Sequence, residues 1–292
     1  MNINKWLKNN TSSLNGKTVA VTGSTGGLGK ELCRYLAQLG ADLILIDRNA
    51  PRSNAFKDEL SEKYKISVSC VNADLSDIGS VKAACEELCK RDISVFIHNA
   101  GAYDIPRYKT DIGFDNVFQI NFISPYYMVK RLLPYLRERG GRVVAVGSIA
   151  HNYSKTDPCD IDFSTRKASS KVYGNAKRYL MFALHELFKV EEAASLSVVH
   201  PGISFTGITN HYPKIIFAII KHPMKIIFMR PKTACLSILK GVFEPTTYCT
   251  WIGPRFFDIW GKPKAKKLKS ASVRERISIG DKAKEIYKNI QA

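Results

Sequence analysis

The stretch Thr22–Glu31, "TGSTGGLGKE", lies between a short β-rich run and an amphipathic run of helix length. It contains glycines at positions 23, 26, 27 and 29. Glycine here permits a tight turn and lets the backbone come close to a pyrophosphate, and the N-terminus of the following helix offers N–H donors and a positive dipole end. A glycine-rich loop alone is weak evidence, but the order strand, loop, helix predicts a dinucleotide-binding site.

Short β-rich runs and amphipathic runs of helix length alternate along the chain from Lys17. Such alternation indicates right-handed βαβ units and a parallel sheet, and near-continuous apolar strands are typical of a sheet covered on both faces. The predicted strands are 17–22, 41–47, 66–73, 93–101, 141–148 and 196–202, with a seventh at 246–253. The sequence therefore predicts an α/β protein with one doubly wound parallel sheet of the Rossmann type and about seven strands.

Breaks in this alternation divide the chain into segments. With 292 residues, 45% of them hydrophobic, a single large core is sufficient. The Rossmann domain is predicted over 17–255, between an N-terminal arm (1–16) and a basic C-terminal extension (256–292). Inside the domain, residues 206–232 break the pattern, because they are apolar and basic and contain no acidic residue.

The spacing of the cysteines and the length of the apolar runs bear on metal binding, membrane insertion and secretion. The seven cysteines form neither a CxxC pair nor a Cys/His cluster with zinc spacing, so we expect reduced thiols in a cytoplasmic protein and no metal site. No uncharged apolar run reaches the roughly 18 residues needed to span a bilayer, and the first residues lack a signal-peptide run. We therefore expect neither a spanning nor a secreted protein.

Positive charge is concentrated near the end of the chain. The net charge is +18, and residues 260–292 hold ten Lys or Arg against three acidic residues, a surplus of +7. A nucleic-acid partner is not expected, because no zinc finger, recognition-helix pattern or RNP-like motif accompanies the charge. Two interpretations remain: a solvated basic surface, or peripheral contact with an anionic membrane through 206–232 and the tail.

Two residues at the end of the second predicted strand bear on the choice of dinucleotide. Asp47 lies where an acidic side chain can accept hydrogen bonds from ribose hydroxyls, and Arg48 could instead receive a 2′-phosphate. No basic residue lies between Gly23 and Lys30 to help bind that phosphate. We therefore favour NAD(H), with NADP(H) as the alternative.

Several motifs in chain order resemble the short-chain dehydrogenase/reductase family. "TGSTGGLG" has the family spacing Thr-Gly-x-x-x-Gly-x-Gly. The further matches are "NADLSD" (72–77), "HNAG" (98–101), "NVFQINFISPYYM" (116–128), "RVVAVGSIAH" (142–151), "YGNAK" (173–177) and "HPGISFT" (200–206). The resemblance covers about residues 15–255, and the insert 149–172 looks like that of the retinol-dehydrogenase-like branch. One departure is His98, which stands where the family has an Asn.

The resemblance implies a set of site residues. The catalytic residues would be Asn121, Ser148, Tyr173 and Lys177. The cofactor-binding residues would be Gly23, Ser24, Thr25, Gly27, Leu28, Gly29, Asp47, Arg48, Asp74, Leu75, Asn99, Ala100, Gly101, Tyr173, Lys177, Pro201, Gly202 and Thr206. It also implies that 206–232 is a helical lid over the substrate and that the protein forms a homo-oligomer.

Hydride transfer to a ketone needs a proton at the oxygen, and the implied role of Tyr173 is to supply it. A free phenol has a pKa of about 10. We expect the charge of Lys177, one helical turn on, together with that of an oxidised nicotinamide ring, to lower the pKa of Tyr173. Ser148 would hydrogen-bond the substrate oxygen. By family analogy, Asn121 would hold a water that connects Lys177 to solvent.

The apolar composition of 206–232 suits a lipophilic carbonyl or alcohol substrate, such as a sterol, retinoid or long-chain ketone. We therefore expect an NAD(P)-dependent oxidoreductase acting on such a compound. Two other hypotheses stay open: a catalytically idle dinucleotide-binding scaffold or sensor, and a lipid- or membrane-binding protein that only uses the fold. The complete set of four catalytic residues favours the enzyme.

Overall fold

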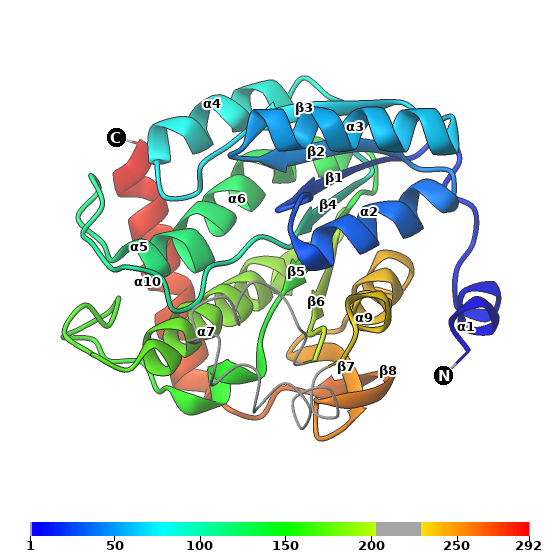
Figure 1. Ribbon diagram of the computed structural model, residues 1–292. Helices are drawn as coiled ribbons and strands as arrows, with labels where there is room; N and C mark the ends of the chain where they lie inside the picture. The colour runs from blue at the N-terminus through cyan, green and yellow to red at the C-terminus, as the bar shows by residue number, and fades with distance from the viewer. Residues whose placement is uncertain (1, 203–228, 292) are drawn as a thin grey trace, which may run out of the picture.

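This computed structural model describes residues 2–202 and 229–291, and within them eight strands form one sheet (Figure 1). The order across the sheet is β3-β2-β1-β4-β5-β6-β7-β8. The strands are β1 (Thr18–Thr22), β2 (Asp42–Asp47), β3 (Val68–Asn72), β4 (Val95–His98), β5 (Arg142–Val146), β6 (Ser195–Val199), β7 (Thr250–Phe256) and β8 (Trp260–Lys267). Strands β1 to β7 are parallel, which confirms the doubly wound α/β prediction.

The eighth strand was not predicted. β8 has the sequence "WGKPKAKK" and pairs antiparallel with β7 at the edge of the sheet. An edge strand has one neighbour and can leave its side chains in water, so it needs no apolar run, and Lys and Pro are common there. Hydrophobic periodicity therefore carries no signal for it.

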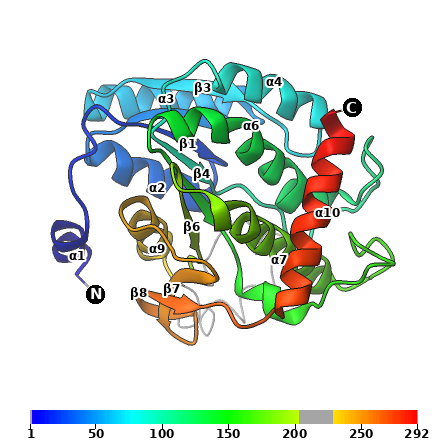
Figure 2. The ribbon, with the colours of Figure 1, turned by 180° about the vertical axis from the view of Figure 1, so that it is seen from behind.

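Helices cover both faces of the sheet (Figures 1 and 2). One face carries α2 (Gly27–Gln38), α3 (Ala50–Tyr64) and α9 (Pro231–Phe243), with α1 (Ile3–Asn10) beside them. The other face carries α4 (Ile78–Leu88), α6 (Ser124–Glu138), α7 (Ser169–Leu187) and α10 (Val273–Gln291). Shorter elements are α5 (Asn116–Phe118), the π-helix η1 (Gln119–Ile123) and the 3-10 helices η2 (Ile149–Tyr153) and η3 (Phe188–Val190). None of the described helices is long and apolar enough to cross a membrane.

The core is divided into two layers because side chains alternate along each strand. On β1, Val19 and Val21 pack towards α2 and α9, whereas Ala20 packs towards the opposite layer. Both layers are apolar, so the strands read as continuous hydrophobic runs in the sequence.

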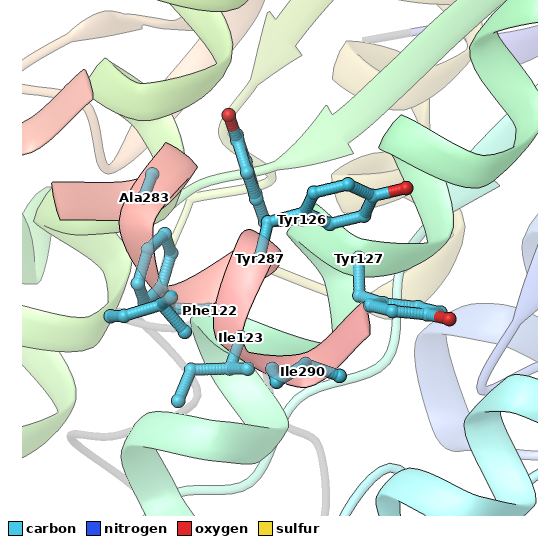
Figure 3. Close-up of a pocket in the computed structure, with 8 residues that line it drawn as sticks. Phe122, Ile123, Tyr126, Tyr127, Ala283, Tyr287 and Ile290 are labelled. Carbon is cyan, nitrogen blue, oxygen red and sulfur yellow. The ribbon is translucent and has the colours of Figure 1, made fainter. Parts of the chain in front are cut away.

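Residues 260–291, which the sequence distinguishes by their charge, form β8 and α10. The buried stripe of α10 contains Ile279, Ala283, Ile286 and Ile290, at helical spacing. Figure 3 shows this side of α10 against Phe122, Tyr126 and Tyr127. The stripe covers α6 and α7, whereas Arg274, Asp281, Lys284, Glu285 and Lys288 are exposed. Residues 206–228 of the predicted lid lie outside the described residues.

Candidate active site

The glycine loop connects β1 to α2 and is shaped by close backbone packing. Gly23 has φ +65°, and a Cβ on Gly29 would lie 2.1 Å from the Gly23 oxygen, so only glycine fits at position 29. Gly26 and Gly27 are exposed at the start of α2, which no side chain caps. Leu28 is half-buried against the core. The loop therefore presents free N–H groups of a helix N-terminus, as a pyrophosphate site requires.

Asp47 is bound to the same loop. Its carboxylate accepts hydrogen bonds from the Ser24 hydroxyl, from Thr25 N at 2.9 Å and from Thr25 Oγ1 at 3.1 Å. Ser24 and Thr25, predicted to bind cofactor, are buried and hold Asp47 in place. Arg48 is exposed. The end of β2 and the glycine loop are thus one unit, with a carboxylate at the position expected for ribose recognition.

The end of β4 also binds the loop. Asn99 donates from Nδ2 to the carbonyls of Thr22 and Gly23, each at 3.1 Å, and Ala100 N donates to Thr22 Oγ1 at 3.1 Å. His98, the departure from the family pattern, is fully buried and hydrogen-bonds Thr22 Oγ1 through Nδ1 at 3.1 Å. Burial lowers the pKa of His98 well below its usual value. His98 is therefore a neutral residue that links two strands.

The segment predicted to line the adenine follows β3. Asp74 caps its own turn by accepting hydrogen bonds from Ser76 N at 2.9 Å and Ser76 Oγ at 2.7 Å. Leu75 is buried, and its carbonyl accepts a 2.6 Å bond from Ser124 Oγ of α6. These contacts hold the segment at the carboxyl edge of the sheet.

Asn121 lies in the π-helix η1 and is fully buried. Its Nδ2 donates to the carbonyls of Val117 and Ala102, both at 2.8 Å, and its Oδ1 accepts from Ala102 N at 3.3 Å. A Cβ built on Gly101 would lie 2.8 Å from Asn121 Oδ1 and 3.5 Å from Lys177 Nζ. The structure thus brings Gly101, Asn121 and Lys177 together. Asn121 lies in a π-helical turn, a feature that often occurs at functional sites.

Ser148 follows β5 and begins η2, where its hydroxyl accepts a 3.2 Å bond from Ala150 N. Tyr173 lies on α7, and its phenol hydrogen-bonds the Ser148 side chain. The close approach of α7 to η2 depends on Gly174, because a Cβ there would lie 2.4 Å from the Ala150 oxygen. The glycine beside the tyrosine therefore allows the two hydroxyl groups to meet.

Lys177 is buried one turn after Tyr173. Its Nζ donates to the Val146 carbonyl at 3.0 Å and lies 5.7 Å from the centre of the Tyr173 ring. The expectation that Lys177 lowers the pKa of Tyr173 is wrong for the protein alone. Burial raises the pKa of Tyr173 to about 12, although the bond from Ser148 opposes this shift, and burial lowers the pKa of Lys177 to about 7. Near neutrality Lys177 is only partly charged, so desolvation dominates both groups.

This burial predicts a pH-dependent cost in stability. Below pH 7 folding buries the charged ammonium, and the cost falls as the pH rises from about 7 towards 10.5, because the unfolded chain still binds that proton. Lys177→Met should therefore increase the free energy of unfolding, with a gain about 2 kcal/mol smaller at pH 9 than at pH 7. Urea denaturation at both pH values measures the gain. A gain independent of pH would show that Lys177 is not buried as a charge.

Pro201 and Gly202 follow β6 at the same edge of the sheet, and both are buried. Gly202 has φ +83°. Thr206, predicted to meet the carboxamide of a nicotinamide, lies outside the described residues. Of the predicted site residues, those from β1, β2, β3, β4, β5, β6 and α7 thus share the carboxyl edge, where α/β sheets place their ligands.

Two contacts of the site were missed from the sequence. Tyr103 lies edge-on to Tyr173, with ring centres 5.3 Å apart, and the Val146 carbonyl binds Lys177. The position of Tyr103, two residues after "HNAG", is a signal that could have suggested it. A backbone carbonyl leaves no such signal.

Comparison with known proteins agrees with this geometry. The family model described as short chain dehydrogenase matches residues 17–168 of the 292. The chain therefore belongs to the short-chain dehydrogenase/reductase family, whose members are nicotinamide-dinucleotide-dependent oxidoreductases. The predicted family resemblance is confirmed.

The chain shares moderate sequence identity with individual members of the family. The chain is 32% identical to mouse retinol dehydrogenase 12, over 67% of this chain and 64% of that one. It is 30% identical to the chloroplastic short-chain dehydrogenase TIC 32 A of Brassica napus, over 69% of this chain and 68% of that one. An uncharacterised protein from Mycobacterium paratuberculosis shares the fold, with a TM-score of 0.73, 21% identity and 95% of each chain covered.

The residues present fit a dinucleotide. Gly29 lets α2 pack closely against the Gly23 carbonyl, and the N-terminus of α2 is uncapped, so Gly23, Gly27 and Gly29 could hold the phosphates. In such a complex Asp47 and Arg48 would face the adenosine ribose, Asp74 and Leu75 would line the adenine, and Lys177 would bind the nicotinamide ribose. Bound there, the dinucleotide would supply or accept a hydride.

Proposed function

We propose that this protein interconverts a lipophilic carbonyl compound and the corresponding secondary alcohol, with Tyr173 as the acid/base. The observation that carries the proposal is the meeting of Ser148, Tyr173 and Lys177 at the carboxyl edge of the sheet, beside the glycine loop. The intact set from two separate elements favours an enzyme over an idle scaffold, which has no chemical need for it.

Ser148 and Tyr173 are suited to bind one substrate oxygen between them. The hydrogen bond that joins their hydroxyls places both groups within reach of the same atom. With a pKa of about 12, Tyr173 is protonated at neutral pH, which is the form that donates a proton when a carbonyl is reduced. For the reverse reaction the phenolate must form, and a charged Lys177 would stabilise it.

Lys177 and Asn121 form the route by which the proton is replaced. Lys177 Nζ and Asn121 Oδ1 both approach Gly101, and Lys177 has a pKa of about 7. A group that titrates near neutrality can release and regain a proton readily. We therefore assign Lys177 the resupply of the proton to Tyr173, with Asn121 as the residue that positions it.

The surroundings of Tyr173 support a lipophilic substrate. Phe163 and Val172 are buried next to it, with Ile105 partly buried and the ring of Tyr103 edge-on. An apolar wall with a few hydroxyl groups is typical of a site for a hydrophobic small molecule. The likeness to mouse retinol dehydrogenase 12 points the same way.

The test is a substrate panel. The protein is mixed with NADH or NADPH and with steroid, retinoid and long-chain ketones, matched by sugar ketones, and the loss of cofactor absorbance is followed. We expect turnover with at least one lipophilic ketone and none with the sugars. Cofactor binding without any turnover would refute the enzyme and favour the scaffold.

The choice of cofactor follows from Asp47. We propose NAD(H), because the fixed carboxylate of Asp47 would repel a 2′-phosphate and no ion pair among the described residues neutralises it. Asp47→Asn keeps the shape and removes the charge, so we expect the ratio of kcat/KM for NAD over NADP to fall about tenfold. The control Asp58→Asn removes an exposed carboxylate of α3 and should leave the ratio unchanged. A wild-type preference for NADP would contradict the proposal.

A cytoplasmic location and a homo-oligomer stay predictions. In the described part of the chain, α10 covers α6 and α7 through Ile279, Ala283 and Ile286. An oligomer would therefore have to use another surface than this one.

A further inference from the structure

We propose that the turn between β7 and β8 binds the surface of an anionic phospholipid membrane. The turn and its flanks, residues 256–260, are here called the aromatic tip. The exposed fractions of Phe257, Phe256 and Trp260 are 79%, 55% and 38%. The hairpin lies at the lower rim of the molecule in both ribbon views (Figures 1 and 2). Neighbouring exposed aromatic side chains are unfavourable in water and gain by entering a membrane interface.

The backbone conformation of the turn does not explain why aromatic side chains stand there. Ile259 N donates to the Phe256 carbonyl at 3.0 Å, and the two central residues, Phe257 and Asp258, have φ of +51° and +58°. Such a hairpin turn favours glycine or asparagine, and a bulky side chain is unfavourable at a positive φ. A phenylalanine that is both strained and exposed gains nothing from the folded chain itself.

Basic side chains surround the aromatic tip. Arg255, Lys262, Lys264 and Lys267, here called the basic collar, are all exposed. Asp258 is the only acidic residue between positions 250 and 274, and it pairs with Lys266 at 2.8 Å. No ion pair within residues 2–202 and 229–291 includes a collar residue. Lysines can protect an edge strand from pairing, but this role does not require the aromatic residues.

The base of the hairpin is held firmly, so the aromatic tip is a fixed projection. The Asp258 carbonyl hydrogen-bonds His200 Nε2 at 3.1 Å, and Lys266 Nζ donates to the Pro254 carbonyl at 2.6 Å. A preorganised tip loses little conformational freedom on binding. Aromatic groups ringed by lysines match the apolar interior and anionic headgroups of a bilayer.

The position of the hairpin connects it to the active site. β7 runs parallel to β6, with Ile252 opposite Val199, so Phe256 lies at the carboxyl edge that also carries Ser148. Gly202 packs against the hairpin, because a Cβ there would lie 2.9 Å from the Ile259 oxygen. Docking would therefore turn the catalytic edge towards the bilayer. A benefit of this orientation for catalysis rests on the proposed lipophilic substrate, whereas membrane binding by the hairpin does not depend on that substrate.

The experiment is sedimentation of the full chain with vesicles of phosphatidylcholine, with and without phosphatidylglycerol, in the absence of substrate. We expect binding to the anionic vesicles, weakened by salt. Lys262→Gln/Lys264→Gln/Lys267→Gln should weaken it about a hundredfold. Phe256→Ser/Phe257→Ser should weaken it about as much, and Phe257→Ser alone, at the most exposed position, about tenfold.

Matched control variants distinguish the effect of the hairpin on vesicle binding from the effects of overall charge and of exposed hydrophobic surface. Lys63→Gln/Lys90→Gln/Lys284→Gln removes the same charge elsewhere, and Tyr108→Ser/Val190→Ser removes exposed apolar groups elsewhere. Both should bind like the wild type. Trp6 and Trp251 are buried, so a blue shift of tryptophan emission on vesicles would report Trp260.

Three results would overturn the proposal. The first is that the protein does not bind anionic vesicles. The second is that the hairpin variants and the control variants lose equal affinity. The third is that a nucleic acid binds the protein more tightly than the vesicles do and displaces them. Turnover of the lipophilic ketones of the substrate panel is measured separately, without vesicles. An active protein that ignores vesicles would refute docking alone, and an inactive one that binds vesicles would refute only the enzyme.

Discussion

Tyr173→Phe is expected to lower kcat by about a hundred- to ten-thousandfold while leaving cofactor affinity within about twofold. The substitution removes the hydroxyl that we propose exchanges a proton with the substrate oxygen, and it retains the ring that packs against Tyr103. Steady-state kinetics with the best ketone of the panel gives kcat, and quenching of protein fluorescence by the dinucleotide gives its affinity.

The matched control is Tyr103→Phe, which removes a neighbouring phenol and keeps the edge-on ring pair. We expect it to change kcat far less than Tyr173→Phe does, because the bond to Ser148 is made by Tyr173. Equal losses in the two variants, or unchanged turnover in Tyr173→Phe, would remove Tyr173 from the chemistry.

Glu275→Leu is expected to lower the free energy of unfolding by about 3 to 5 kcal/mol. The side chain of Arg178, only 2% exposed, donates to both Glu275 oxygens at 2.7 Å and to the carbonyls of His151 and Ser270. Without Glu275 a buried guanidinium would keep its charge and lose its counter-ion. Urea denaturation at neutral pH measures the loss.

Two further variants make this result interpretable. Arg178→Met/Glu275→Leu removes both charges and should recover part of the loss, whereas Arg91→Met breaks an exposed pair with Glu87 and should cost no more than about 1 kcal/mol. A Glu275→Leu loss as small as that of Arg91→Met would show that the buried pair is not stabilising.

The same pair gives an expected pH response. Burial alone would raise the pKa of Glu275, but the bonds from Arg178 outweigh it and hold the pKa below its usual value of 4.5. The stabilisation is therefore present above that pH and is lost as the pH falls through the lowered value. The pair joins α10 to the helix that carries Lys177, so acid should loosen both.

The fold could be predicted from the sequence because its parallel strands are buried on both faces. β1 and β5 read as continuous apolar runs, and the glycine loop placed the dinucleotide edge. β8 escaped prediction because an edge strand of lysines lacks any hydrophobic period. The charge of 260–292 was noticed in the sequence, although the apolar stripe of α10 is what attaches this helix to α6 and α7.

The site was predicted mainly through ordered motifs, and its electrostatics were not. Tyr173 and Lys177 were correctly placed one turn apart on a helix, but in the protein without the dinucleotide the pKa of Tyr173 is raised and not lowered. The shift depends on how much protein surrounds the phenol, which spacing along a helix cannot reveal. Arg178 gave no signal, because its partner Glu275 lies 97 residues away.

The sequence by itself determined the class of fold, the family and the residues available for chemistry, because these depend on local periodicity and on short motifs. Only the tertiary structure decided which groups meet: Gly174 brings Tyr173 to Ser148, Asp47 is held by the glycine loop, and two phenylalanines stand exposed at the end of β7. Contacts between distant segments arise from packing the whole chain, and burial, which sets the pKa values and the exposed surface, is a property of that packing alone.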